Sequence, residues 1–349
     1  MNVLSLFDGC SGGQLALQKL GIHVDNYYAS EIDKYAIKVT QANFPNTIQL
    51  GDVTQVKPNE RGMGVDYALD YDPPIDLLMG GSPCQGFSFA GHQLNFDDPR
   101  SKLFFDFVRI RDECMPKYVL LENVRMAKKS QDVISKYMGF EPQALNSSKV
   151  SAQNRYRLYW FGKRVGDSYE QITIPPMICK GLTMQNILED GYETEEMTSG
   201  GKSHCLTARY NGAVWWNSIE RKQRTMVLKE NPTMSKDGLI RVGTADLKGH
   251  DSIKRVYAQE GKAPTLTTMQ GGHREPKVAT SKDMWRKLTP LECERLQTLP
   301  DNYTNHVSNS QRYKMIGNGW TVDVIAHILK GIHLDGWNEM YNNNNKEYV

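Results

Sequence analysis

Short apolar runs alternate with amphipathic stretches over the first part of the chain, and this alternation is its strongest structural signal. The runs are typical of buried strands, and the stretches between them have the spacing of helices that bury one face. The runs lie at residues 3–7, 27–30, 48–50, 75–79, 118–121 and 157–162, and helices are expected from about residue 14, from about residue 34 and over 101–113. Strands separated by helices indicate βαβ units, in which a mostly parallel sheet is covered on both faces. Residues 1–165 are therefore predicted to form a doubly wound, Rossmann-like α/β domain.

The periodicity weakens after residue 162, where glycine, threonine and proline replace the regular pattern. Residues 166–287 are therefore predicted to form a smaller, irregular domain. Regular pattern returns at Thr289, a residue type common at helix N-caps, which is followed by proline. A last helix is expected over 321–332, because its apolar residues share one face. Residues 288–349 are predicted to return to the first domain.

Charge is distributed unevenly along the chain. The net charge is only +2, but residues 202–290 contain 17 Lys or Arg and 8 Asp or Glu, which gives this segment a net charge of +9 and leaves −7 for the rest. A segment with this excess attracts a polyanion such as nucleic acid, although a solvated basic face has the same composition.

The cysteines and the first residues narrow the classes of protein to which the chain can belong. The six cysteines are widely separated and form no C-x-x-C pair, which argues against a zinc site and a disulfide framework and fits a reducing compartment. The first seven residues have the pattern of a strand rather than of a signal peptide, and no stretch is apolar enough to span a membrane. We therefore expect a cytoplasmic protein with no metal site and no membrane contact.

Glycines and acids follow the first three predicted strands. The first turn, residues 7–13, contains three glycines, so its backbone can approach a ligand closely. Glu31 follows the second strand, where it can accept hydrogen bonds from ribose hydroxyls, and Asp52 follows the third, where it can face an adenine amino group. Ligands of doubly wound sheets bind at these carboxyl ends of strands. Together the three strand ends predict a nucleoside-type cofactor.

The sequence GGSPCQGFS places Cys84 directly after the fourth predicted strand, beside the same crevice. A thiolate is a strong nucleophile, whereas a structural cysteine is more often found inside an element than at a turn. The next strand ends in Glu122, so a nucleophile and an acid/base group protrude from neighbouring strand ends. Arg155 and Arg157 point the same way if their segment is extended, and one of them could complement the carboxylate or a pyrimidine carbonyl oxygen. A surface strand with exposed basic residues is the alternative.

These motifs carry a family resemblance. The segments LSLFDGCSGG, GGSPCQGFSFAG, ENV, QNRYR, RKLTPLECERLQTLPDNYT and IGNGWTVDVIAHIL resemble the motifs of the DNA (cytosine-5) methyltransferases, cover both ends of the chain and keep the family's order. The pair Pro-Cys-Gln and Glu-Asn-Val is the most specific part. LFDG, SKLFFDFVRI and the long segment from DNYTNH to AHIL look closer to the animal de novo branch, whereas Gln85 follows the bacterial pattern.

The resemblance implies a reaction. Cys84 would add to carbon 6 of cytosine, so that carbon 5 can accept a methyl group from S-adenosylmethionine. Glu122 would donate a proton to ring nitrogen 3, while Arg157, with Arg155 as a second candidate, would orient Glu122 and hold the carbonyl oxygen. Loss of the carbon 5 proton then expels the thiolate.

The resemblance also implies the ligands. The cofactor would be S-adenosylmethionine, and the substrate would be double-stranded DNA whose target base is flipped into the pocket. The implied cofactor-binding residues are Phe7, Gly9, Glu31, Ile32, Asp52, Pro83 and Asn318. The loop from Gly86 to about Pro99 could close over the base. The compact chain is expected to be a monomeric bacterial or phage enzyme, either part of restriction-modification or solitary.

The basic, irregular segment falls where this family carries its target-recognition domain. Lys and Arg would position the duplex through its phosphates, while a few side chains read base edges. Arg209, Arg241 and Arg274 are candidate readers, among which the sequence does not choose.

Two positions depart from the family pattern. Ser11 stands where many relatives have a second glycine in the first turn, and the last motif reads Gly317-Asn318-Gly319-Trp320 instead of ending in a small residue and valine. Neither departure removes a reacting group, so both concern the shape of the cofactor pocket.

Three other functions share some of these features. A transfer-RNA cytosine methyltransferase uses the same groups, but the long basic segment favours DNA. A catalytically dead DNA-binding relative would have lost Cys84 or Glu122, and this chain has both. A nicotinamide dehydrogenase could share the glycine turn and the ribose acid, but it would not need the Pro-Cys-Gln and Glu-Asn-Val pair.

Overall fold

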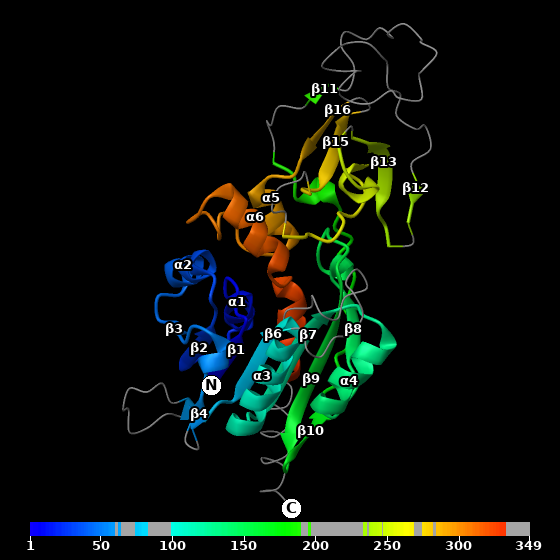
Figure 1. Cartoon of the computed structure of the whole chain (residues 1–349). Helices are drawn as coiled ribbons and strands as arrows, with labels where there is room; N and C mark the ends of the chain where they lie inside the picture. The colour runs from blue at the N-terminus through cyan, green and yellow to red at the C-terminus, as the bar shows by residue number, and fades with distance from the viewer. Residues whose placement is uncertain are drawn as a thin grey trace, which may run out of the picture. The chain divides into compact units, whose positions relative to one another are not determined.

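The computed structural model divides into two units by packing (Figure 1). It describes residues 1–59, 62–63, 74–82, 99–189, 195–196, 233–235, 237–245, 247–268, 274–281 and 284–332. Unit 1 comprises Met1–Asn146, Tyr156–Met177 and the chain from Trp320 onwards, and unit 2 comprises Ser147–Arg155 and Ile178–Gly319. Packing thus joins residues 288–319 to unit 2. The sequence had instead predicted that all of residues 288–349 return to the first domain.

Unit 1 is built on a sheet with the order β10-β9-β7-β6-β1-β2-β3, in which β8 also pairs with β9. The strands are β1 (Asn2–Leu6), β2 (Asn26–Ser30), β3 (Ile48–Gln49), β6 (Leu77–Gly81), β7 (Tyr118–Val124), β8 (Gln143–Asn146), β9 (Tyr156–Val165) and β10 (Ser168–Gln171). The five strands from β3 to β7 in this order pair in parallel, and β8, β9 and β10 are added in antiparallel fashion. The predicted doubly wound α/β fold is confirmed.

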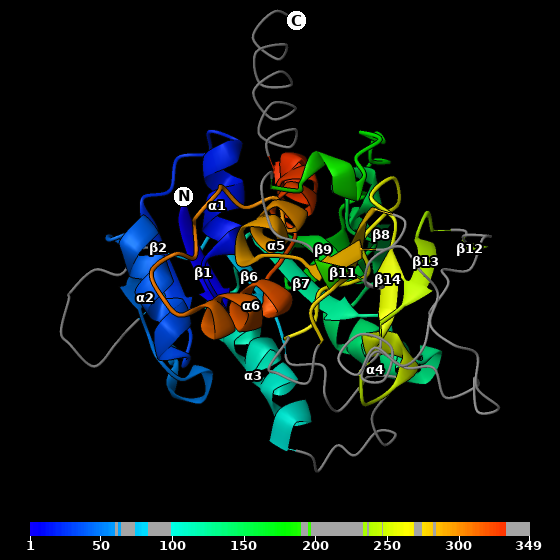
Figure 2. The same ribbon diagram turned by 90° about the horizontal axis from the view of Figure 1, so that it is seen from above.

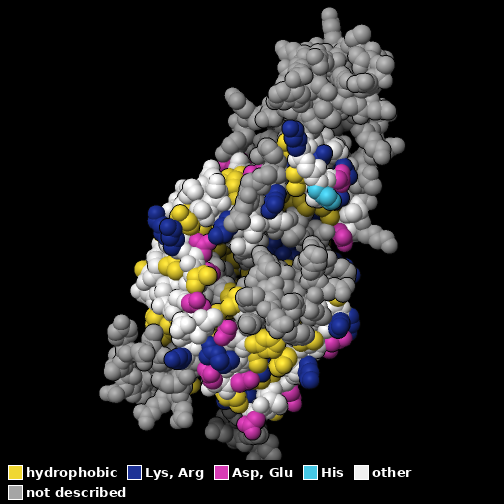
Figure 3. Space-filling model, in the orientation of Figure 1, with side chains coloured by type: hydrophobic (Ala, Val, Ile, Leu, Met, Phe, Trp, Pro, Cys, Tyr) yellow, Lys and Arg dark blue, Asp and Glu magenta, His cyan; other side chains and the backbone are white. Residues whose placement is uncertain are grey.

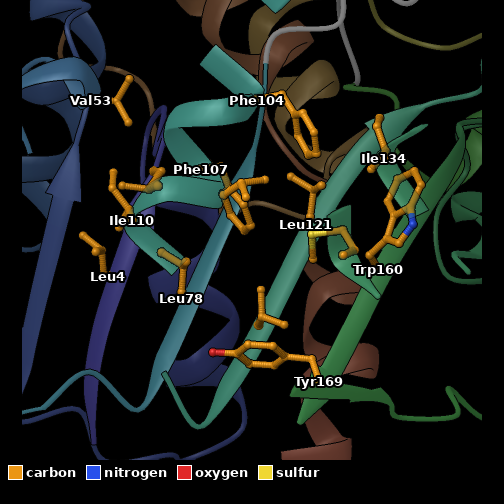
Figure 4. Close-up of a cluster of buried hydrophobic side chains, with 14 of the residues drawn as sticks. Leu4, Val53, Leu78, Phe104, Phe107, Ile110, Leu121, Ile134, Trp160 and Tyr169 are labelled. Carbon is orange, nitrogen blue, oxygen red and sulfur yellow. The ribbon is translucent and has the colours of Figure 1, made fainter. Parts of the chain in front are cut away.

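One face of this sheet is covered by α3 (Pro99–Cys114) and α4 (Lys128–Met138). Alternate strand residues point to this face, as the twofold period of a strand requires, and they meet the apolar sides of the two helices (Figure 4). The cluster includes Leu4, Leu78, Leu121 and Trp160 from the strands and Phe104, Phe107, Ile110 and Ile134 from the helices, all of them fully buried. Each such side chain contributes about 1.5–3 kcal/mol of hydrophobic stabilisation.

The opposite face is covered by α1 (Gly12–Lys19) and by a helix over 322–332 (Figure 2). Both helices approach the sheet through glycines. A Cβ at Gly13 would lie 2.5 Å from Cε of Met79, and a Cβ at Gly331 would lie 2.9 Å from the ring of Phe161. The remaining helix of the parallel half is α2 (Lys34–Asn43), which Asp33 caps by accepting a hydrogen bond from the Tyr35 N–H at 2.9 Å.

The described residues of unit 2 form a second sheet and two α-helices. The sheet order is β11-β16-β15-β14-β13-β12. The elements are β11 (Glu195–Glu196), β12 (Thr233–Met234), β13 (Ile240–Thr244), β14 (Arg255–Tyr257), β15 (Lys277–Ser281), β16 (Met284–Lys287), α5 (Pro290–Leu296) and α6 (Asn309–Asn318). The predicted helix start at Thr289 is confirmed, because its hydroxyl accepts from the Glu292 N–H at 3.2 Å while Glu292 accepts from the Thr289 N–H at 2.8 Å.

A buried ion pair holds the two helices of unit 2 together. Glu294 on α5 is fully buried, and its Oε1 lies 3.0 Å from Nη2 of Arg312 on α6. Oε1 also accepts from the Thr304 N–H at 2.8 Å, and Oε2 accepts from the Asn302 N–H at 2.8 Å. All these groups donate to the two oxygens of Glu294, and the guanidinium of Arg312 is its ion-pair partner.

Arg312→Leu is therefore expected to lower the free energy of unfolding by about 3–5 kcal/mol, because it leaves a buried charge without its partner. Arg255→Leu is the matched control, since Arg255 pairs with the half-exposed Asp251 at 2.8 Å, and exposed pairs contribute only about 0–1 kcal/mol. Urea titration followed by circular dichroism measures both changes. Equal losses in the two variants would contradict this account of the pair.

Candidate active site

The first turn follows β1 and has an unusual backbone. Phe7, Gly9 and Ser11 have φ angles of 57°, 61° and 59°, in the left-handed region that side chains other than glycine seldom adopt. The Asp8 N–H donates to the Ser30 carbonyl at 3.2 Å, and the Ser11 N–H donates to the Asp8 carbonyl at 3.2 Å. The turn is therefore tied to the end of β2 and closed on itself.

Glu31, at the end of β2, is fixed by backbone donors. Its Oε2 accepts from the Gly9 N–H at 2.8 Å, and its Oε1 accepts from the N–H groups of Ile32 and Asp33, both at 2.8 Å. The side chain of Ile32 next to it is 75% exposed. Because β1 and β2 are parallel neighbours, Glu31 and the first turn lie at the same edge of the sheet.

Asp52 lies beyond the end of β3, the next strand along this edge. Its Oδ1 accepts from the Thr54 N–H and from the Thr54 hydroxyl, both at 2.9 Å, so it caps the short helix η1 (Val53–Gln55). The structure thus brings Phe7, Gly9, Glu31, Ile32 and Asp52 to one edge of unit 1.

Glu122 and Arg157 form an ion pair on the neighbouring strands β7 and β9. Oε1 of Glu122 lies 3.0 Å from Nε of Arg157, and the two side chains are 12% and 13% exposed. Glu122 is in register with Gly81 of β6, and a Cβ at Gly81 would lie 3.0 Å from Oε2 of Glu122. The absence of a side chain at Gly81 therefore lets the second carboxylate oxygen lie close to the backbone of β6.

The chain continues from Gly81 through Ser82 towards Cys84. Asn123 is buried, and its amide donates to the Ser82 hydroxyl at 3.2 Å, which joins the ends of β6 and β7. Pro83, Cys84 and the predicted loop from Gly86 to residue 98 lie outside the described residues. Their predicted roles remain predictions.

Arg155 has other partners than the predicted carboxylate. Its guanidinium is buried and donates to the carbonyl oxygens of Leu266 at 3.0 Å, Gly317 at 3.2 Å and Gly319 at 3.0 Å. The alternation that would align it with Arg157 does not apply, because β9 begins at Tyr156. Arg155 thus fixes the backbone around Asn318, an exposed residue at the end of α6, and Arg157 is the arginine that pairs with Glu122 in the described ion pairs.

The sequence singled out Trp320 only because it departs from the family pattern. The structure places its indole beside the carboxylate of Glu122. A Cβ at Gly81 would lie 3.0 Å from the indole Nε1, and a Cβ at Gly13 would lie 3.2 Å from Cζ3. The indole thus borders both the first turn and Gly81, the residue in register with Glu122. Glycines at both contact points are the sequence signal that could have indicated this placement.

Asp8 is the residue that sequence reasoning missed. Desolvation by burial raises the pKa of its carboxyl to about 6, although hydrogen bonds from Ser11, Ser5 and Tyr27 act in the opposite direction. An acidic residue inside an otherwise apolar strand-to-helix turn was the available signal.

The predicted base readers are only partly described. Arg241 donates to Asp251 at 2.9 Å and to the Thr244 hydroxyl at 2.8 Å, Arg274 is exposed, and Arg209 lies outside the described residues. On the face drawn in Figure 3, Lys and Arg side chains are interspersed with Asp and Glu over the described surface. Within the described ranges, no helix is long and apolar enough to cross a bilayer, and no cluster of His, Cys, Asp or Glu has the arrangement of a metal site.

Solved structures of two methyltransferases have the same fold as this chain. A prophage-encoded DNA modification methyltransferase of E. coli superposes with a TM-score of 0.61 at 24% identity over 95% of this chain and 98% of its own. DNMT2 of Spodoptera frugiperda superposes with a TM-score of 0.59 at 19% identity over 95% of this chain and 99% of its own.

Sequence comparison identifies the family. The model of the C-5 cytosine-specific DNA methylases matches residues 1–333, and the chain belongs to this family. The type II methyltransferase M.HhaI of Haemophilus parahaemolyticus is 30% identical, covering 95% of this chain and 94% of its own. The orphan methyltransferase M.SPBetaI of Bacillus phage SPbeta is 28% identical, covering 95% and 97%. The predicted family is confirmed.

Proposed function

We propose that this protein transfers a methyl group from S-adenosylmethionine to carbon 5 of a flipped-out cytosine in a specific duplex DNA sequence, through a covalent adduct with Cys84. The observation that carries the proposal is the Glu122–Arg157 pair beside Gly81, on the strand that leads to Cys84. This pair supplies an acid/base group and a fixed cation at the edge of the sheet where β6 leads towards the proposed nucleophile.

The residues of the first turn fit the cofactor. A Cβ at Gly9 would meet no atom within 4 Å, so the backbone there borders open space. Oε2 of Glu31 accepts one backbone N–H and has a second lone pair left, which suits a ribose hydroxyl. Ile32, Asp52, Pro83 and Asn318 complete the proposed set. When bound, the cofactor supplies an electrophilic methyl group.

Each of the protein's own groups has a role in the proposed reaction. The Cys84 thiolate forms a bond to carbon 6, and Glu122 protonates ring nitrogen 3, so that the ring's electron density moves to carbon 5. Arg157 holds Glu122 and offers its remaining N–H donors to the carbonyl oxygen. After methylation, carbon 5 gives its proton to a water molecule, and the electrons of that bond re-form the carbon 5–carbon 6 double bond as the sulfur–carbon bond breaks. Ring nitrogen 3 returns its proton to Glu122, so the thiolate, the acid and the aromatic ring are restored.

Glu31→Gln is expected to weaken cofactor binding by about 10–100-fold, because charge-assisted hydrogen bonds are worth about 1.5–3 kcal/mol. A glutamine amide would also turn a donor towards backbone N–H groups that need acceptors. Isothermal titration with S-adenosylhomocysteine measures the change. Asp33→Asn is the control, since asparagine keeps the cap of α2, and an equal loss in that variant would contradict the assignment.

The substrate is tested by incubating the protein with duplex DNA, transfer RNA and methyl-labelled cofactor, followed by bisulfite sequencing of the modified product. We expect label at carbon 5 of cytosine in one DNA sequence context. Label confined to transfer RNA would replace the proposed substrate. Phage and type II relatives favour a bacterial or phage enzyme, in restriction-modification or alone. We propose in addition that it acts as a monomer in the cytoplasm.

A further inference from the structure

A network of hydroxyl groups and one carboxylate lies beneath the first turn. Oδ2 of Asp8 accepts from the Ser11 hydroxyl at 2.5 Å, and Oδ1 accepts from the Tyr27 hydroxyl at 2.8 Å. The Ser11 hydroxyl also lies 3.1 Å from the Thr40 hydroxyl, which donates to the Gly9 carbonyl at 3.5 Å. The network therefore connects β2 and α2 to the backbone that borders the proposed cofactor.

Ser11 shows that this network bears on the turn's conformation. Its φ of 59° is strained for a residue with a side chain, and a glycine would adopt the same backbone freely. The side chain of Ser11 is fully buried, and its hydroxyl contacts both Asp8 and Thr40. The side chain thus holds the turn in a conformation that the backbone alone does not favour.

The arrangement of donors requires the ionised form of Asp8. Hydroxyls of Ser5 on β1, Tyr27 on β2 and Ser11 at the start of α1 all direct hydrogen bonds to its carboxylate. A protonated carboxyl carries its own O–H, which must donate, so one of these hydroxyls would lose its acceptor and turn away. Glu31 is the charged group that faces Asp8, and its repulsion favours protonation, as desolvation does.

We propose that Asp8 is a positioning residue whose ionised carboxylate holds the first turn in its cofactor-binding conformation, so that cofactor affinity is coupled to the ionisation of Asp8. The inference rests on the proposed cofactor. Because the pKa of Asp8 is raised to about 6, the coupling falls within the pH range in which the folded protein can be studied.

The test is isothermal titration of S-adenosylhomocysteine into the full-length protein between pH 5 and pH 8. The wild type is expected to bind with constant affinity above pH 7 and to lose affinity below pH 6, by up to about tenfold per pH unit for one linked proton. Asp8→Asn is expected to bind about tenfold more weakly at pH 7.5, as for one lost charge-assisted bond, and without the fall below pH 6. Tyr27→Phe removes one hydrogen-bond donor to the ionised carboxylate of Asp8. The affinity of this variant for the cofactor analogue should therefore begin to fall at a higher pH than that of the wild type.

A thermal melt distinguishes positioning from a purely structural role. Because folding raises the pKa of Asp8, protonation of Asp8 stabilises the folded protein. This stabilisation is complete below the unfolded pKa of about 3.8 and is lost as the pH rises through about 6. Asp8→Asn should therefore melt at or above the wild-type temperature at pH 7.5 while binding more weakly. A lower melting temperature that parallels the loss of binding would overturn the proposal.

Asp132→Asn, which removes an exposed carboxylate on α4, serves as the control and should match the wild type at every pH. A wild-type affinity that is constant from pH 5 to 8, or an Asp8→Asn variant with the wild-type pH dependence, would refute the coupling while leaving the proposed function intact. A wild type that binds no cofactor analogue at any pH would overturn the proposed function and this inference with it.

Discussion

Replacing Cys84 with serine is expected to lower kcat for methyl transfer by at least about a thousandfold, the scale on which removal of a covalent nucleophile acts. A thiol with a pKa of about 8.5 supplies some thiolate at neutral pH, whereas a serine hydroxyl stays protonated without a dedicated base. Carbon 5 of cytosine then lacks the electron density that addition at carbon 6 provides. Labelled methyl transfer to the mapped DNA sequence, measured in a single turnover, gives the rate.

Cys179→Ser is the matched control for this substitution. Cys179 is a free, exposed thiol in unit 2, and its replacement should leave the rate unchanged. The wild-type cofactor affinity should survive in both variants, because neither thiol belongs to the first turn. A Cys84→Ser variant that transfers methyl groups at the wild-type rate would eliminate the covalent route.

Replacing Glu122 with glutamine is expected to lower kcat by about 10²–10⁴-fold, the range for loss of a general acid/base group. Glutamine preserves the volume and can still accept a hydrogen bond from Arg157, but it cannot protonate ring nitrogen 3. The cofactor dissociation constant should not change, since Glu122 contacts Arg157 rather than the first turn. Single-turnover transfer and titration with S-adenosylhomocysteine measure the two quantities.

Glu113→Gln provides the comparison for Glu122. Glu113 lies on α3 and pairs with Arg109 at 3.1 Å, with 41% of its side chain exposed, so its neutralisation should change neither quantity. If Glu122→Gln weakened cofactor binding as much as it slowed transfer, Glu122 would serve the cofactor pocket instead of the base.

Much of unit 1 follows from local sequence. Apolar runs such as residues 75–79 and 118–121 predicted parallel neighbours that the structure confirms as β6 and β7. Glu31 was correctly placed at the end of the second strand, because a strand end can be recognised where an apolar run stops at an acid. The helix cap at Thr289 depends only on residues three positions apart, and it too was predictable.

The sequence did not reveal contacts between segments that are distant along the chain. Arg155 and Arg157 look equivalent two positions apart, yet the strand begins between them, and Arg155 bonds to carbonyl groups more than 100 residues away. Trp320 contacts glycines of the first turn and of β6, which only the folded sheet brings to it. The burial that alters Asp8 likewise depends on strands and helices packed around it.

The central claim, a covalent bond between Cys84 and the target cytosine, is tested most directly with duplex DNA that carries 5-fluorocytosine at the mapped site. Fluorine takes the place of the carbon 5 proton, and a base cannot remove it. The sulfur–carbon bond should therefore persist after methyl transfer. Intact-mass spectrometry of the denatured wild type is expected to show one stoichiometric protein–DNA adduct, with the DNA attached to the peptide that contains Cys84. An active wild type that forms no adduct, or an adduct of equal yield in Cys84→Ser, would contradict the account.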